Sequence, residues 1–98
     1  ITGKNKTKKR YFKMKNFDIK FRGVDDFYRP VFKVVDKAIY FCSTNILVPD
    51  KDRFPKGTKE EINEYFRQNQ HEIELFGDHF NCEPNGGNSP KWSFNIID

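Results

Sequence analysis

The sequence predicts an α+β domain, an antiparallel sheet of four to five strands with one helix packed on one face. Three observations predict this class. Apolar and polar residues alternate along early segments, a capped segment with helical periodicity follows, and another alternating segment ends the chain. The 98 residues are enough for one domain, and an aromatic content of 16%, with eleven Phe, indicates a folded, Phe-rich core.

The first strand begins at Met14 in "MKNFDIKFR". Residues 17–22 alternate between three apolar and three charged side chains, which is typical of a strand buried on one face. Gly23 and the two acids after Val24 interrupt the alternation. Pro30 cannot donate a hydrogen bond to a neighbouring strand, so we place it at the start of the next one.

The second and third strands are "VFKVVD", at 31–36, and "AIYFCST", at 38–44. Both are rich in β-branched or aromatic residues. The intervening Asp36-Lys37 pair predicts a two-residue hairpin turn, so the first three strands form an antiparallel meander. Residues 45–57 contain two prolines and alternating charges, which predicts a loop whose Ile46, Leu47 and Val48 tuck against the core.

A helix of about 19 residues is predicted between Thr58 and Gly77. Thr58 is suited to cap its N-terminus, and Glu61 lies three residues later, as in a capping box. Apolar residues recur at helical spacing up to Phe76, and Gly77 is suited to end the helix.

The rest of the chain predicts a short strand in "HFNCE" at 79–83, an open loop in "PNGGNSP" and a terminal strand in "KWSFNIID". In the terminal strand Trp92, Phe94 and Ile96 share one face. A strand at the end of the chain is suited to a sheet edge. We therefore expect a monomer or a weak dimer formed by pairing of edge strands.

The charge divides the chain into two parts. Residues 1–13 carry six basic side chains and no acid, whereas residues 14–98 carry 12 basic and 14 acidic side chains. We interpret residues 1–13 as a basic, flexible leader that lies upstream of a natural start at Met14, and residues 14–98 as the single domain.

The leader interleaves basic side chains with aromatic rings, a combination typical of proteins that bind single-stranded nucleic acid. An alternative function is therefore a nucleic-acid-binding accessory protein. Its candidate residues are Lys8, Lys9, Arg10, Tyr11, Phe12 and Lys13 of the leader, extended by Lys20 and Arg22.

The side chains that could support catalysis or hold a metal are few. Cys42 and Cys82, with His71 and His79, are the only soft metal ligands in the sequence, and a single H-x-x-C pair is too little for a zinc site. We expect no metal, no cofactor and no catalytic site. A small enzyme that uses Cys82, with His79 or His71 as its base, is the weakest alternative. The sequence has no apolar run of membrane-spanning length, and its basic N-terminus lacks the apolar stretch of a signal peptide. We expect a cytoplasmic protein with no membrane partner.

Three stretches, "RGVDDFYRPVFK", "AIYFCS" and "FNCEPNGGNSP", resemble a pattern found in small uncharacterised proteins of phages and conjugative elements of gut bacteria, and in modules of their polyvalent proteins. The matching residues are Gly23, Asp25, Phe27, Arg29, Pro30, Val31, Phe32, Phe80, Asn81, Glu83 and Pro84. The chain departs from the pattern at Phe27, where Trp is commoner, and at Cys82, where Gly is commoner.

The resemblance implies a mobile-element or prophage setting but no activity. Together with the lack of a catalytic motif, it favours a non-enzymatic protein-binding module. The candidate partner-binding residues are Phe27, Tyr28, Arg29 and Glu83. We expect Asp25 or Asp26 to cap the turn between the first two strands, and Arg29 to pair with one of these acids or with Glu83.

Overall fold

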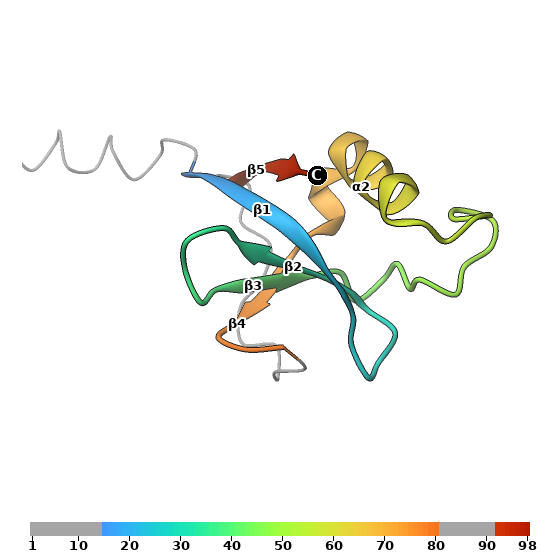
Figure 1. Ribbon diagram of the computed structural model, residues 1–98, viewed down its shortest axis with the longest axis horizontal. Helices are drawn as coiled ribbons and strands as arrows, with labels where there is room; N and C mark the ends of the chain where they lie inside the picture. The colour runs from blue at the N-terminus through green and yellow to red at the C-terminus, as the bar shows by residue number, and fades with distance from the viewer. Residues whose placement is uncertain (1–14, 81–91) are drawn as a thin grey trace, which may run out of the picture.

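The computed structural model describes residues 15–80 and 92–98, and it has one α-helix packed on a five-stranded sheet (Figure 1). The elements are β1 (Lys15–Val24), β2 (Pro30–Val34), β3 (Tyr40–Cys42), α2 (Lys59–Gln68), the 3-10 helix η1 (Gln70–Glu72), β4 (Leu75–Gly77) and β5 (Trp92–Ile97). The predicted α+β class is confirmed. The predicted leader and Met14 lie outside the described residues.

The sheet has the strand order β4-β3-β2-β1-β5. Strands β1 to β4 pair antiparallel with their neighbours, as predicted for the meander, but β5 runs parallel to β1. The expectation of a wholly antiparallel sheet is therefore wrong for this last pair. Side chains alternate with the same period in parallel and antiparallel strands, so the alternation of residues 92–97 carries no information about direction.

The connection between β2 and β3 is longer than predicted. The Val34 amide donates to the Ile39 carbonyl at 2.9 Å, so the loop between these paired residues holds 35–38 rather than Asp36 and Lys37 alone. Two-residue hairpin turns require positive φ angles that Gly and Asn tolerate best. Neither residue occurs at 35–38, and a longer loop avoids the strain.

The helix is shorter than predicted, with 10 residues rather than about 19. Its predicted start is confirmed, because Thr58 caps it by accepting a hydrogen bond from the Glu61 amide at 3.2 Å. The helix ends at Gln68, where Asn69 leaves helical geometry and its side-chain amide donates to the Tyr65 carbonyl at 2.8 Å. Gly77 lies in a strand and does not end the helix.

The segment after the helix forms β4 at 75–77, earlier in the chain than the short strand predicted at 79–83. Residues 79 and 80 lie in the bend and turn after β4, and the rest of the predicted strand lies outside the described residues. The helical spacing of Ile73 and Phe76 misled the prediction. Ile73 lies in the connection between η1 and β4, and its side chain is buried in the core. Phe76 lies in β4 and pairs with Phe41 of β3.

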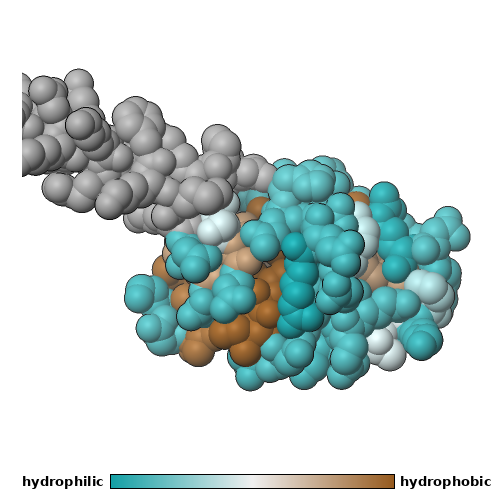
Figure 2. Space-filling view, turned by 90° about the horizontal axis from the view of Figure 1, so that it is seen from above, coloured by the Kyte–Doolittle hydropathy of each residue, from teal (hydrophilic) through white to brown (hydrophobic). Residues whose placement is uncertain are grey.

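The core lies between the sheet and α2 and is rich in phenylalanine. Phe32 of β2 contacts Phe66 of α2 with ring centroids 5.4 Å apart, and the loop before the helix adds buried Ile46 and Phe54. Leu47 does not tuck in as expected, because it is 38% exposed. Figure 2 shows apolar side chains gathered at the end that holds the sheet, whereas polar side chains cover the end with α2 and the preceding loop. Within the described ranges, no helix is both long and apolar enough to cross a membrane.

A bulge in β1 positions the turn that follows it. The register between β1 and β2 shifts between Phe21 and Gly23, and Gly23 pairs with Val31 at a φ of 132°. Glycine is suited to this position because side-chain-bearing residues rarely adopt such an angle. Pro30 begins β2, as predicted.

Candidate functional site

The turn between β1 and β2 is organised by the carboxylate of Asp25. Its Oδ1 atom accepts hydrogen bonds from the amides of Phe27 and Arg29, each at 2.9 Å. Its Oδ2 atom accepts one from Arg29 Nε at 2.6 Å. The prediction that an acid caps this turn and pairs with Arg29 is confirmed, with Asp25 as the acid. Glu83, the other predicted partner of Arg29, lies outside the described residues.

The Asp25–Arg29 pair is buried, with 1% of the Asp25 side chain and 9% of the Arg29 side chain exposed. A buried ion pair is stable only when hydrogen bonds satisfy its charged atoms, as the three donors to Asp25 do here. Two backbone hydrogen bonds brace the same turn, from the Asp25 amide to the Arg29 carbonyl and from the Tyr28 amide to the Asp25 carbonyl. The turn is therefore held in one conformation.

This conformation directs two aromatic rings into solvent. Phe27 is 58% exposed and Tyr28 is 60% exposed. The Arg29 guanidinium carbon lies 4.8 Å from the centroid of the Phe27 ring, which is within cation–π distance. Arg29 itself is buried, so it supports the turn and the Phe27 ring from within.

Tyr28 has a φ of 65°, in the left-handed region, and is the only non-glycine residue with positive φ in the described part of the chain. Glycine and asparagine tolerate this region, whereas a bulky residue there is strained by about 1–3 kcal/mol. Strain of this kind persists only where the surroundings hold the residue in place, and it clusters at functional sites. The anchored Asp25 turn supplies that support.

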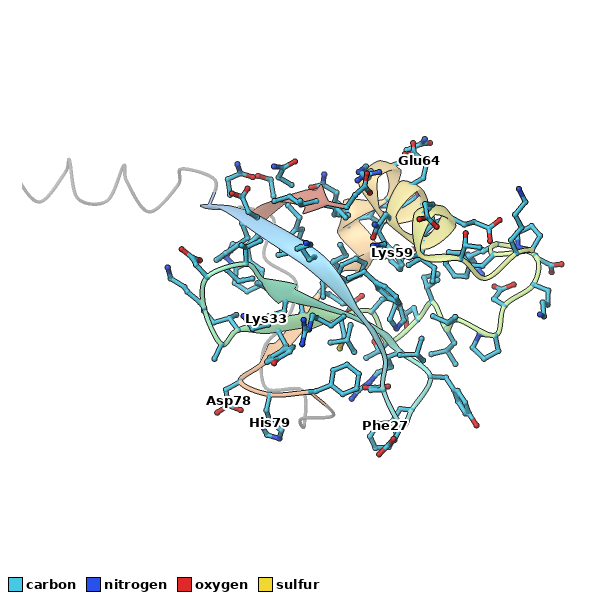
Figure 3. The ribbon with its side chains drawn as sticks, in the orientation of Figure 1. Phe27, Lys33, Lys59, Glu64, Asp78 and His79 are labelled. Atoms are coloured by element: carbon cyan, nitrogen blue, oxygen red, sulfur yellow. The ribbon has the colours of Figure 1, made fainter. Side chains whose placement is uncertain are left out.

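Val24, Phe27, Tyr28 and Leu47 are exposed at or beside this turn, and we call these four residues the aromatic corner. These are four of the five exposed large apolar side chains that the structure describes. The Val48 amide donates to the Tyr28 carbonyl at 3.1 Å, which holds the segment with Leu47 against the turn. In Figure 3, Phe27 lies at the tip of the turn, away from Lys59 and Glu64 of α2.

A second surface lies on the sheet face opposite α2. Lys20 and Arg22, predicted as nucleic-acid-binding residues, are exposed in β1 and border a shallow hollow of about 90 Å³ with Lys33 of β2. The six predicted leader residues, from Lys8 to Lys13, lie outside the described ranges. Sequence reasoning missed Lys33, although its position in the alternating second strand places it on the polar face.

The described residues bring together little that resembles a catalytic or metal centre. His79 Nδ1 lies 2.7 Å from Asp78 Oδ1, and this hydrogen bond lowers the pKa of the Asp78 carboxyl below its usual range. Both residues are exposed sequence neighbours (Figure 3), which is typical of a surface contact between two polar side chains. Within 15–80 and 92–98, no group of three or more His, Cys, Asp or Glu is placed to hold a metal ion. Cys82 lies outside these ranges, and Cys42 is half-buried.

Comparison with family models, with curated proteins and with solved structures finds no match to this chain. The fold and these two surfaces are therefore the basis on which a function can be argued. Sequence reasoning found Phe27 and Tyr28 but missed Val24 and Leu47. Leu47 lies in the apolar triplet Ile46-Leu47-Val48, and the sequence does not indicate which of these three side chains faces solvent.

Proposed function

We propose that this domain is a non-enzymatic protein-binding module that contacts its partner through the aromatic corner. The observation that carries the proposal is the strained, exposed Tyr28 beside exposed Phe27, on a turn that a buried ion pair holds in place. A bulky ring in the left-handed region lowers stability and fills no core, which favours a role outside the fold.

The size of the corner fits the centre of a small interface. Aromatic side chains each bury about 150–250 Å² when they are enclosed, and a standard interface buries about 800 Å² per partner. Because these residues are 58% and 60% exposed, Phe27 and Tyr28 would supply about a third of that area, and Val24 and Leu47 would add to it. Aromatic residues are enriched among the residues that dominate binding energy, and a rigid turn reduces the entropy lost on association.

The chemistry of the corner indicates its partner. The Arg29 side chain is buried against Asp25, so the exposed surface is mainly apolar and aromatic. A matching partner is a protein with an apolar pocket into which the two rings insert. A mobile-element or prophage setting for that partner remains an expectation, based on the sequence resemblance alone.

The test begins with capture of a partner from a candidate host and continues with the purified partner. Phe27→Ser removes one ring at an exposed position, so the fold should remain intact. We expect it to raise the dissociation constant by about 30-fold or more, since a central aromatic side chain contributes about 2 kcal/mol or more. Isothermal titration calorimetry measures this, together with a less negative heat capacity change of binding.

Val35→Ser is the matched control. Val35 is 49% exposed but lies outside the aromatic corner, so the loss of its apolar side chain should leave binding unchanged. The proposal is wrong if the two variants weaken binding equally, or if neither does. Sedimentation velocity of the isolated chain tests whether the partner is a second copy of this chain. In that case the wild type self-associates and Phe27→Ser does not.

A further inference from the structure

Beyond the aromatic corner, we propose that the sheet face opposite α2 binds single-stranded nucleic acid along a row formed by Lys20, Lys33 and Tyr40, with Arg22 beside it. The row joins three neighbouring strands. Lys20 of β1 lies directly opposite Lys33 of β2, and Lys33 lies directly opposite Tyr40 of β3.

The row lies on the sheet face opposite α2. Ile19 and Phe32, the neighbours of Lys20 and Lys33 in their strands, are fully buried in the core on the helix side. Side chains alternate along a strand, so Lys20 and Lys33 point to the other face. Lys20 and Arg22 are exposed there, and Lys33 and Tyr40 are partly exposed.

The charge on this face is unbalanced. Like charges directly opposite each other in neighbouring strands destabilise a sheet, yet Lys20 faces Lys33 across β1 and β2. No acid borders their hollow among the described residues, whose lining is completed by Val34 and Val35. The nearest acid along β1 on this face is Asp18, which accepts a hydrogen bond from Asn95 at 3.3 Å. A bound anion would relieve the repulsion between the two lysines.

The position of Tyr40 favours a single strand over other polyanions. Its partly exposed ring ends the row that begins with the two lysines, so phosphates and a stacked base can be contacted together. A duplex keeps its bases stacked inside, and an acidic peptide has no base to place on the ring.

The test measures fluorescence anisotropy of a labelled oligothymidylate of about 12 nucleotides with the full chain, over a series of salt concentrations. We expect Lys20→Glu to weaken binding about tenfold and to reduce the slope of log affinity against log salt by about 0.7 or more. This substitution converts a Lys–Lys pair into a Glu–Lys pair, so the sheet should remain folded. Lys51→Glu is the matched control, because Lys51 is exposed in the loop between β3 and α2 and is not part of the row. We expect it to lower the affinity by less than about twofold.

The stacking arm uses Tyr40→Leu, which should weaken binding at least about fivefold with an unchanged salt slope, whereas Tyr40→Phe should retain binding. Melting curves verify that each variant is folded. The proposal is overturned if Lys20→Glu and Lys51→Glu behave alike, because the leader would then account for the binding. It is also overturned if Tyr40→Leu binds like the wild type, if a duplex of equal length binds more tightly, or if no binding occurs at low salt.

Discussion

At the scale of single residues, one carboxylate determines the geometry of the aromatic corner. Asp25 accepts three hydrogen bonds within the turn, and its side chain is almost completely buried. Removing it leaves the Arg29 charge buried without this partner and frees the amides of Phe27 and Arg29. The stability of the turn, and hence the position of both exposed rings, therefore depends on this residue.

We predict that Asp25→Ala lowers the free energy of unfolding by about 3–5 kcal/mol, the usual effect of breaking a buried ion pair. Asp25→Asn keeps an acceptor for the two amides and should lose less. Asp36→Ala is the control: its side chain is 77% exposed, and we expect a change below about 0.5 kcal/mol. Urea denaturation measures all three, and equal effects of Asp25→Ala and Asp36→Ala would contradict this account of the turn.

The sequence predicted part of this turn. Adjacent acids after Gly23 indicated an acid-capped turn, but Asp25 and Asp26 have the same intrinsic preference, so only the folded geometry distinguishes them. The left-handed conformation of Tyr28 had no sequence signal at all. A positive φ angle in a turn is usually found at Gly or Asn. A tyrosine at this position therefore does not predict the left-handed conformation.

At the scale of elements, side chains protect the outer edge of β5. The Phe94 amide donates to Gln70 Oε1 at 2.9 Å, and the Ile96 carbonyl accepts from Arg67 Nε and Nη2 at 3.1 and 2.9 Å. Arg67 also pairs with Asp98 at 2.7 Å, which raises the pKa of Arg67 and lowers that of Asp98. Two of the backbone groups that would pair with another strand are thus already occupied.

We predict that the double variant Arg67→Ala/Gln70→Ala self-associates more strongly than the wild type, because it exposes the backbone groups of Phe94 and Ile96. Sedimentation velocity at increasing concentration measures this. Glu64→Ala is the control, since it removes an exposed partner of Arg67 and Gln68 but no hydrogen bond to β5. An unchanged sedimentation coefficient in the double variant would show that these side chains do not guard the edge.

Element boundaries were the least predictable part of the fold. The capping signal at Thr58 was local and correct, but no Gly or Pro marks the true end of α2 between Thr58 and Gly77. Asn69 ends the helix, and asparagine is a weaker signal than glycine. The direction of β5 depends on how the chain crosses the sheet after β4, and that is a tertiary property.

At the scale of the whole molecule, one small domain offers two chemically different surfaces. The aromatic corner lies where β1 turns into β2, and the row of Lys20, Lys33 and Tyr40 crosses the sheet face opposite α2 from β1 to β3. The class of fold and the two exposed rings were predictable, since they depend on alternation and on turn residues. The row was only partly predictable, because it depends on register between strands.

The free energy of unfolding of Tyr28→Asn tests the central claim most directly, that the turn retains a strained aromatic residue for a role outside the fold. Asparagine tolerates the left-handed region, so urea denaturation should show this variant to be more stable than the wild type by about 1 kcal/mol. Phe27→Asn, at an exposed position without positive φ, should show no such gain. A Tyr28→Asn variant that is no more stable than the wild type would contradict the claim.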